Sequence, residues 1–396
     1  ELNDNDNSYK NDYARNNDIE IENTLRGEIN YSLSKRFNLN TGFSTKLLRL
    51  DYDRWFKIRP SYIYGYSFSG DIPSIISRAE FDNIYFNNKN TIATPLDTIG
   101  IPDTNITNHL LELWKTGGFI HLTYQPTKKL DVLVGGRYDH LSYTNKVSFS
   151  PRLGLSYHVN QILTLNFSGG RYFQFPDNRD LNSNKLGQSS LTSYYADQSA
   201  IGIEYFSARD KRITLEIYTK TMGDIVINEI LEDSDGRDSI NYKKIINAGK
   251  GRSKGLEFFI QKKYFNNWYG SFAWSHSISE MWDDRDEGKY YNWDYDYGDV
   301  INVIGGYKIE YKKYDWYQKY KKTYWSYLFN LLPFSPSDEY EISFKLRYLG
   351  GRPYTPKTYD HSIREWYTSS EGDWNTKRYG SYLRFDLMLQ QRYYFD

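Results

Sequence analysis

The sequence predicts an all-β fold, an antiparallel transmembrane β-barrel, from three observations. Apolar and polar residues alternate in many segments, and aromatic residues are abundant, with 40 Tyr, 21 Phe and 10 Trp among 396 residues. Short connections also alternate with long ones along the chain. A β-barrel crosses lipid with only half of each strand apolar, so the mean hydropathy of −0.75 is compatible with this fold.

The alternation is clearest in a predicted hairpin around the turn Tyr264–Asn267. Leu256, Phe258 and Ile260 fall on one face of the first strand, and Phe272 begins the apolar row of the second. Successive side chains of a strand point to opposite sides, so a period of two predicts one wet and one dry face. A soluble β-sandwich alternates in the same way, so this hairpin alone does not distinguish the two folds.

The pattern recurs along the chain in strands that are longer than usual. The further segments are 25–33, 131–139, 152–159, 163–168, 341–348 and 383–392. A membrane strand needs about 9–11 residues, against about 5–6 in soluble sheets. We expect about thirteen strands over residues 1–396, which form part of a transmembrane barrel.

Composition excludes several classes of protein. The 50 basic and 50 acidic residues give no electrostatic case for nucleic-acid binding. The sequence has no Cys, which excludes disulfides and cysteine metal sites within it. No run of about 18 apolar residues suggests a transmembrane helix. The tyrosines and tryptophans fit the aromatic girdles at the two membrane–water interfaces of a barrel.

The connections fall into two sets, which a barrel would place at opposite ends. Short ones are expected at 34–38, 125–129, 158–161, 208–211 and 264–267. Long ones are expected at 53–107, 176–190, 231–241, 283–291 and 356–377. Long loops are extracellular and short turns periplasmic in outer-membrane barrels, so 53–107 is expected to be a long extracellular loop. A short turn at 145–146 and an insertion at 311–337 break the rule.

The insertion carries helical rather than strand periodicity. Tyr317, Tyr320 and Tyr324 begin a series at steps of three and four, and Pro333 ends it. We therefore expect residues 312–337 to be a periplasmic-side insertion with a helix over about Asp315–Leu331. Lysines beside aromatic and leucine residues suit a helix that lies in a membrane interface. A disordered turn, or a helix docked on a partner, is the alternative.

Several segments resemble TonB-dependent outer-membrane receptors of the kind found in Bacteroidetes-like bacteria. They are SPRLGLSYHVNQILTLNFSGGRYFQFP (Ser150–Pro176), NAGKGRSKGLEFFIQKK (Asn247–Lys263), YDYGDVINVIGGYKI (Tyr295–Ile309), LRYLGGRPYTP (Leu346–Pro356) and YLRFDLMLQQRYYF (Tyr382–Phe395). The resemblance covers most of 150–396 and follows the family's order. It implies the C-terminal portion of a 22-stranded barrel, whose plug domain is expected outside this sequence.

The resemblance implies a ligand-gated uptake receptor of the bacterial outer membrane, energised by TonB, and not an enzyme. Its expected partners are the lipid bilayer, the TonB complex, a plug domain and a surface lipoprotein. One alternative is a plugless pore, or a structural or secretion-associated barrel. Another is an extracellular β-rich adhesion or carbohydrate-binding protein. Siderophores, cobalamin, glycans and peptides all remain possible ligands.

The sequence gives no supported catalytic or cofactor motif. It has no H-E-x-x-H. GKGRSKG (Gly249–Gly255) includes the spacing G-x-S-x-G, but no helix pattern follows it, and it fits no phosphate-binding loop. The six histidines show no helical metal spacing. No cofactor is therefore expected, and a calcium ion held by Asp283, Asp284 and Asp286 is the weak exception, because the loop lacks EF-hand spacing.

Two groups of residues are the candidates for functional contacts. Aromatic residues of the long connections are the candidate ligand contacts: Trp55, Trp282, Tyr290, Tyr291 and Trp293. Charged residues on the polar side of their strands are expected to face the lumen: Arg152, Glu204, Glu216, Glu257, Lys345, Arg347, Arg384 and Asp386. We expect the second group to contact a plug or to line water rather than to select a substrate.

Overall fold

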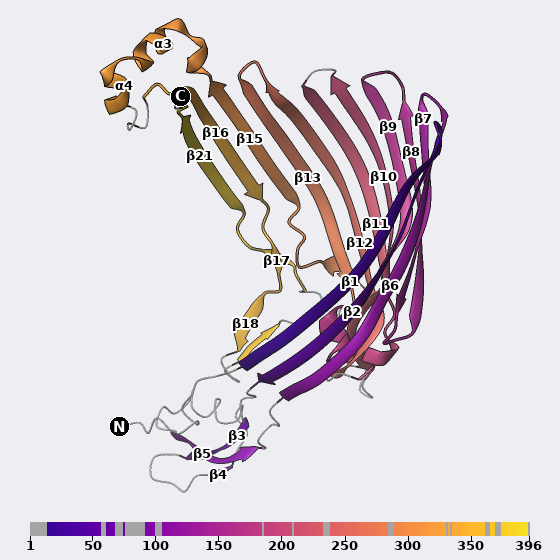
Figure 1. Cartoon of the computed structure of the whole chain (residues 1–396). Coiled ribbons are helices and arrows are strands. Elements are labelled where there is room, and N and C mark those ends of the chain that lie inside the picture. The colour runs from indigo at the N-terminus through magenta and orange to yellow at the C-terminus, as the bar shows by residue number, and fades with distance from the viewer. Residues whose placement is uncertain are drawn as a thin grey trace.

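The chain folds into a large curved antiparallel sheet, seen in a computed structural model (Figure 1). The structure describes residues 14–56, 61–67, 74–75, 92–99, 105–183, 186–207, 210–232, 238–283, 289–329, 332, 335–360, 365–368 and 374–394.

Thirteen strands form the continuous path of the sheet, each antiparallel to the next. In order they are β1 (Ala14–Ser34), β2 (Phe37–Phe56), β6 (Asn105–Thr127), β7 (Leu130–Leu141), β8 (Lys146–His158), β9 (Leu163–Gln174), β10 (Tyr194–Ser207), β11 (Lys211–Glu232), β12 (Asp238–Phe265), β13 (Trp268–Trp282), β15 (Asp299–Ile309), β16 (Glu339–Leu349) and β21 (Tyr382–Arg392). The predicted antiparallel β-barrel class and its strand number are confirmed.

The β12–β13 hairpin shows how the local sequence produces these strands. Phe258 pairs with Trp274 and Glu257 with Ser275, so the apolar row of one strand meets that of the other. Asn266 and Asn267 form the turn with φ of 52° and 69°. Positive φ at both central residues matches the twist of the flanking strands, and Asn tolerates this conformation well.

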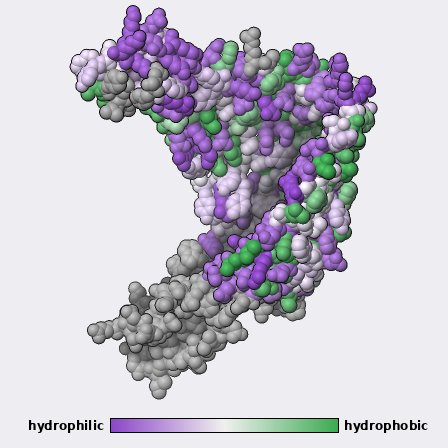
Figure 2. Space-filling model, in the orientation of Figure 1, coloured by the Kyte–Doolittle hydropathy of each residue, from purple (hydrophilic) through white to green (hydrophobic). Residues whose placement is uncertain are grey.

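The pairing register extends the two rows across the whole sheet. Phe272 pairs with Val303, Val303 with Leu346, and Leu346 with Phe385. We call this side the apolar face and the side that carries Glu257 the polar face. Six large apolar residues share the apolar face, and we expect them to face lipid: Leu155, Leu165, Phe258, Phe272, Phe344 and Leu387. Hydrophobic side chains follow the outer margin of the curved sheet at the right of the view in Figure 2.

Toward the long-loop end of β2 and β6 the polarity of the two faces is partly reversed, although Ile21 and Leu110 stay exposed on the apolar-face side. Leu48 and Leu50 of β2 lie on the polar-face register, opposite Glu22 and Glu20, yet both are buried. Between them Arg49 lies on the other face, with its guanidinium 3.8 Å from the Glu112 carboxylate and exposed. The buried cluster on the polar face comprises Leu48, Leu50, Tyr52, Leu111, Leu113, Leu141, Leu181, Leu191 and Ile245. The sequence analysis did not predict this reversal.

The long connections contain further short elements at this end. They are a sheet of β3 (Ser61–Ser67), β4 (Ser74–Ile75) and β5 (Ile92–Ile99), the helices α2 (Asn178–Leu181) and η2 (Gln188–Ser190), β14 (Tyr291–Asn292), the pair β17 (Pro353–Tyr354) and β20 (Lys377–Arg378), and the pair β18 (Lys357–Asp360) and β19 (Glu365–Thr368). The first connection is shorter than the expected 53–107, because β2 and β6 stay paired up to Phe56 and Asn105.

The insertion at the short-turn end contains η3 (Tyr311–Lys313), α3 (Asp315–Lys321) and α4 (Tyr324–Phe329). A single helix over Asp315–Leu331 was expected, and the structure has two short helices instead. Thr323 Oγ1 donates to Tyr320 O at 2.6 Å, and Ser326 Oγ donates to Lys321 O at 3.0 Å. Side-chain hydroxyls that bond to backbone carbonyls compete with the helical pattern and so end α3 here.

Among the described residues, no helix has the length and apolar character needed to span a membrane.

Candidate ligand-contact site at the long-loop end

Two long connections are locked together at the long-loop end by Asn375. Its amide nitrogen donates to Asn292 O and to Asp294 Oδ1, each at 2.8 Å, and Asn292 Nδ2 donates to Asn375 O at 3.1 Å. Asn375 has a φ of 53°, is buried, and receives a further bond from Thr355 Oγ1 on its side-chain oxygen. The β13–β15 connection is therefore fixed to the β16–β21 connection.

A second contact between these connections is an ion pair. Arg378 Nη2 lies 2.5 Å from Asp296 Oδ2, and the carboxylate is buried. Asp296 Oδ1 also accepts from the backbone N–H of Ser279 at 3.1 Å, so it ties the connection to β13. Arg352 Nε donates to Asp294 O at 2.9 Å. The acidic side chains Asp294 and Asp296 hold loop to loop in this structure.

The register divides four of the aromatic candidates between the two sides of the sheet. Tyr291 pairs with Met281 on the polar side and is buried, and the Trp293 ring lies over Gly251 on the same side. Trp282 pairs with Lys250 on the apolar-face side, and its ring lies 4.6 Å from Lys250 Nζ.

The fourth aromatic candidate, Tyr290, also lies on the apolar-face side. Its ring lies 4.2 Å from the guanidinium carbon of Arg252, whose partner across the strands is Glu280. Tyr291 and Trp293 thus lie on the polar-face side, and of these two Trp293 is only half-buried. Sequence reasoning could not separate the four, because the connection reverses direction at β14.

Two other predictions fall partly beyond what the structure describes. Trp55 lies near the end of β2, and its side chain is outside the described residues. Asp284 and Asp286 are also outside them, and Asp283 is buried. Within the described part of the chain, no group of three or more His, Cys, Asp or Glu side chains could hold a metal ion. The calcium site stays a prediction.

The β9–β10 connection folds over the polar face of β2 and β6. Asn182 is fully buried, and its Nδ2 donates to Leu50 O and His109 O, both at 3.2 Å. Its Oδ1 also contacts His109 Nδ1. Leu181 and Leu191 flank these bonds within the buried cluster. The connection thus covers the inner surface of the long-loop end.

A polar cavity of about 280 Å³ lies beside this connection. Its charged and polar lining comprises Glu22, Lys46, Lys115, Arg137, Asp139 and Asn178. Lys46 lies 2.7 Å from Glu22, and Lys115 Nζ donates to Asn178 Oδ1 at 2.9 Å. Lys46 and Lys115 are direct partners across β2 and β6. Two like charges opposite one another are unfavourable, and the Glu22 carboxylate beside Lys46 offsets their repulsion.

Sequence reasoning missed this cavity. Each of its residues is an ordinary polar position in its own strand, and residues 57–104 separate β2 from β6. The feature that indicates the cavity is the pairing of Lys46 with Lys115, which is known only once the β2–β6 pairing register is known.

The register places all eight candidate lumen residues on the polar face. Lys345 pairs with Asp386, and Arg347 with Arg384. Glu216 lies directly opposite Glu257, and Glu204 forms a 2.7 Å ion pair with Arg212.

Arg152, the remaining candidate, stacks on a neighbouring ring and keeps a free donor. Its guanidinium carbon lies 4.8 Å from the Tyr172 ring, and its buried Nε has no hydrogen-bond partner among the described residues. On the same face Glu216 and Glu257 are exposed, and these two charges are open to water or to a second polypeptide.

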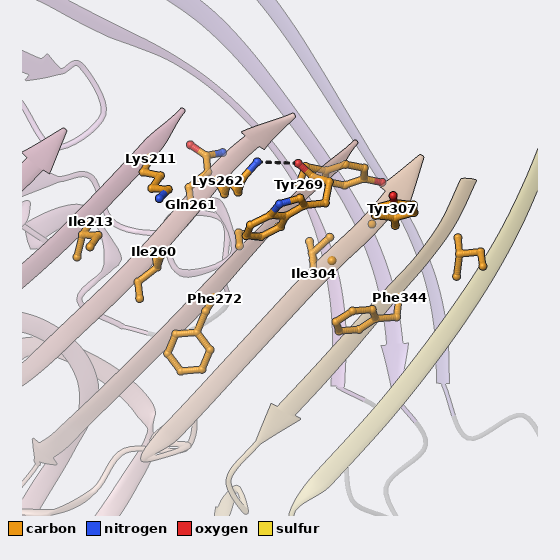
Figure 3. Close-up of a pocket in the computed structure, with 16 residues that line it drawn as sticks. Lys211, Ile213, Ile260, Gln261, Lys262, Tyr269, Phe272, Ile304, Tyr307 and Phe344 are labelled. Atoms are coloured by element: carbon orange, nitrogen blue, oxygen red, sulfur yellow. Dashed lines mark hydrogen bonds between the residues drawn. The ribbon is translucent and has the colours of Figure 1, made fainter. Parts of the chain in front are cut away.

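A groove of about 620 Å³ crosses the opposite, apolar face near the short-turn end (Figure 3). Ile213, Ile260, Phe272 and Phe344 line it, and Gly270 pairs with Gly305 between the two phenylalanines. Because these glycines lack side chains, they leave the depression between the rings. Its lining is almost wholly apolar, which suits a surface that contacts acyl chains.

The family model described as TonB dependent receptor-like, beta-barrel, matches residues 1–395. A comparison with curated protein sequences finds no significant match.

Similar solved structures are outer-membrane transporters and receptors. The FrpB iron transporter from Neisseria meningitidis (F3-3 variant) aligns with a TM-score of 0.57 at 11% identity, over 95% of this chain and 49% of that one. The ferripyoverdine receptor of Pseudomonas aeruginosa, bound to ferripyoverdine, gives 0.56 at 15%, over 96% and 43%. The transporter YddB from Escherichia coli gives 0.53 at 11%, over 95% and 48%. The chain therefore spans about half the length of these structures, and the likeness shows the shared fold.

Proposed function

Because the chain belongs to the TonB-dependent receptor β-barrel family, we propose that it is the barrel portion of a receptor that imports a ligand with energy from TonB. Its membrane is the bacterial outer membrane. The observation that carries the proposal is the family match over 1–395, and the sheet agrees with it. One face is apolar for lipid, the other is charged, and long connections gather at one end.

The polar face supports the expectation of a plug domain. Arg152 keeps an unpaired buried donor, and Glu216 and Glu257 face each other across two strands. Unpaired donors and like-charge pairs are costly in isolation and are relieved by a complementary surface. We propose that a plug supplies that surface and that TonB acts on the plug from the short-turn, periplasmic end. Ligand binding by the barrel and movement of the plug by TonB need no covalent chemistry, so we propose a receptor and not an enzyme.

The long-loop end supports reversible ligand contact. Trp293 offers a ring on the polar side, and the cavity beside Lys46 and Lys115 offers cationic groups. The ring suits a ring or a sugar, and the cavity, on other strands of the same end, suits a polar or anionic group that competes with Glu22 for Lys46. Two of the similar structures are named for iron or ferripyoverdine, so ferric chelates are the first ligands to test. Contacts by Trp55, Trp282, Tyr290 and Tyr291, calcium binding and a surface lipoprotein stay predictions.

Uptake assays test the proposal directly. Cells that express the receptor would be given radiolabelled ferric siderophores, cobalamin, glycans and peptides, with and without TonB. We expect accumulation of one class that requires both the receptor and TonB. The double variant Lys46→Ala/Lys115→Ala should weaken that uptake, while Lys128→Ala at a short turn should not. TonB-independent accumulation would overturn the proposal.

Conductance distinguishes the receptor from a plugless pore, the alternative function. In planar bilayers the receptor isolated from its native membrane should give no steady open current, because a plug fills its lumen. A stable open channel with ohmic conductance would favour the pore.

A further inference from the structure

The insertion between β15 and β16 (residues 310–338) differs in charge and composition from the rest of the chain. Residues 311–337 contain five Lys and a single acidic residue, Asp315, whereas the whole chain has 50 basic and 50 acidic residues. Ten of these 27 residues are aromatic. Basic and aromatic residues together are typical of surfaces that bind anionic phospholipid.

The insertion is attached to the apolar-face side of the sheet. Gln391 follows Leu387 and Leu389 in the apolar row of β21, and Tyr393 comes directly after the end of the strand. Gln391 Nε2 donates to Ser335 O at 2.8 Å, and Tyr393 Oη lies 2.8 Å from Ser335 Oγ. Through Ser335 the insertion contacts the sheet on the side that faces lipid, while Lys312 pairs with Glu339 on the polar-face register.

Aromatic residues on neighbouring strands mark the depth of this attachment. Trp268 and Tyr307 are cross-strand partners at the short-turn end of the apolar face, and both are about half exposed. Tryptophan and tyrosine at such positions lie at the headgroup level. Glu310 follows Tyr307 by three residues, which is about 10 Å of strand at ~3.4 Å per residue. The insertion thus leaves the sheet close to the membrane interface.

One side of the insertion is anchored to the rim of the sheet. Tyr317 of α3 is 1% exposed, and burial raises the pKa of its phenol. Lys321 Nζ lies 3.1 Å from Asp338 and donates to Tyr394 O at 2.8 Å. Lys312 forms a 2.6 Å ion pair with Glu339. These contacts fix η3 and α3 to the rim, and α4 follows α3 directly in the chain.

The other side of the insertion is apolar and exposed. Tyr324 is 81% exposed and Leu328 57%, and the two lie four residues apart on one face of α4. Leu332 is also exposed. Lys319 and Lys322 lie nearby in the sequence and are exposed. Hydrophilic side chains gather over the rest of the insertion, at the upper left of Figure 2.

We propose that the described residues of the insertion, 310–329 with Leu332 and 335–338, form a phospholipid-binding surface that rests on the periplasmic leaflet of the outer membrane. Tyr324, Leu328 and Leu332 enter the boundary between headgroups and acyl chains, and Lys319 and Lys322 contact anionic headgroup phosphates. The helices lie on the leaflet and do not cross it, because each is shorter than two turns. The proposal is independent of ligand uptake and goes beyond it.

Depth-dependent quenching tests this proposal. The sequence has no cysteine, so Leu328→Cys provides a single thiol within it for a bimane label. The labelled protein would be reconstituted into phosphatidylcholine vesicles with brominated acyl chains, with and without phosphatidylglycerol. We expect bimane at position 328 to be quenched at least about twofold more than at Lys128→Cys, an exposed position in the β6–β7 turn at the same end.

Charge reversal and a water-soluble quencher complete the test. Lys319→Glu/Lys322→Glu should abolish the additional quenching that phosphatidylglycerol gives, because the attraction to the anionic surface is lost. Heat-dependent migration on gels would establish that each variant is folded. Equal quenching at 328 and 128, or full access of iodide to the label at 328 in vesicles, would overturn the proposal. Iodide access would leave that face to water or to a periplasmic protein.

Discussion

The middle of the sheet and its long-loop end differ in polarity, because β2 and β6 partly reverse their two faces toward the long-loop end. In the middle, Phe258 lies on the apolar face and Glu257 on the polar face. At the long-loop end of β2, Leu50 is buried on the polar face and Arg49 is exposed on the other. The residues on each face match what surrounds them in the middle of the sheet and at its long-loop end. The outer face meets lipid in the middle and water beyond it, and the inner face becomes a small soluble-type core.

Ion pairs on the apolar-face register mark the level at which this change occurs. Arg171 pairs with Asp197 at 2.7 Å, and Arg252 with Glu280 at 2.6 Å. All four side chains lie on the apolar-face register toward the long-loop end of their strands. Charged side chains are unfavourable at the bilayer midplane and nearly neutral at the interface, so these rows indicate the outer limit of the hydrocarbon.

The largest effect is expected where the inner face is a closed core. Leu50→Ala should lower the free energy of unfolding by about 2–5 kcal/mol, because a fully buried leucine leaves a cavity under the β9–β10 connection. Urea titration of the protein in lipid vesicles would measure it. Its neighbour Asp51→Ala, on the opposite face, should change stability by less than about 0.5 kcal/mol. If Leu50→Ala and Asp51→Ala lower the free energy of unfolding equally, the inner face at this end is not a more tightly packed core than the outer face.

The second test places a charge on the lipid side of the middle region. Phe258→Arg should destabilise the folded protein by about 2–4 kcal/mol in the same titration. Glu257→Arg should not destabilise it. The new arginine would face Glu216 directly across β11 and β12, so a gain of about 0.2–1 kcal/mol is expected. If both variants lose the same stability, the assignment of the two faces is wrong.

The third test concerns the loop contacts that the long-loop end has and the middle lacks. Asn375→Asp would place a carboxylate at hydrogen-bond distance from Asp294, where the amide now donates at 2.8 Å. At neutral pH we expect the free energy of local opening of these connections, measured by hydrogen exchange, to fall by about 1–3 kcal/mol. Protonation relieves the repulsion, so protection should return as the pH falls. Hydrogen exchange of residues 289–298 would report it, with Thr376→Ser as the conservative control.

The smallest effect is expected on the outer face of the long-loop end. Arg49→Leu should change stability by less than about 0.5 kcal/mol, because the arginine lies in water and its ion pair is exposed. A stabilisation comparable in size to the loss in Phe258→Arg would place position 49 in hydrocarbon. That result would move the boundary of the membrane beyond the Arg49–Glu112 row.

The faces of the strands could be predicted from the sequence because a period of two is a local property. The reversal at the long-loop end could not, since Leu48 and Leu50 alternate in the same way as lipid-facing residues do. A period of two shows that the two faces of a strand differ in polarity. It does not show whether lipid, water or another segment of the protein contacts each face. The cover is the β9–β10 connection, and its Asn182 bonds to a residue 132 positions away.

The candidate site was predicted less well for the same reason. Sequence identified the connection around Trp282 and Trp293, but the fold puts these two rings on opposite sides of the sheet. The lock between Asn292 and Asn375 joins residues 83 positions apart. In the insertion, helical periodicity was recognised, and the break at Thr323 was missed because it depends on hydroxyl bonds to the backbone.

The bonds of Asn182 to Leu50 and His109 have a consequence for the order of assembly. Leu50 and His109 lie on β2 and β6, which are paired only after the chain of residues 57–104 has been closed into a loop. Contacts across a long loop form more slowly than those within a tight hairpin such as β7–β8. The β9–β10 connection therefore cannot make both hydrogen bonds of Asn182 until β2 and β6 are paired. In a time-resolved crosslinking experiment during membrane insertion, a pair at 50 and 182 should appear after a pair at 134 and 153, within the β7–β8 hairpin. The opposite order would show that the connection guides the pairing of β2 with β6 instead of following it.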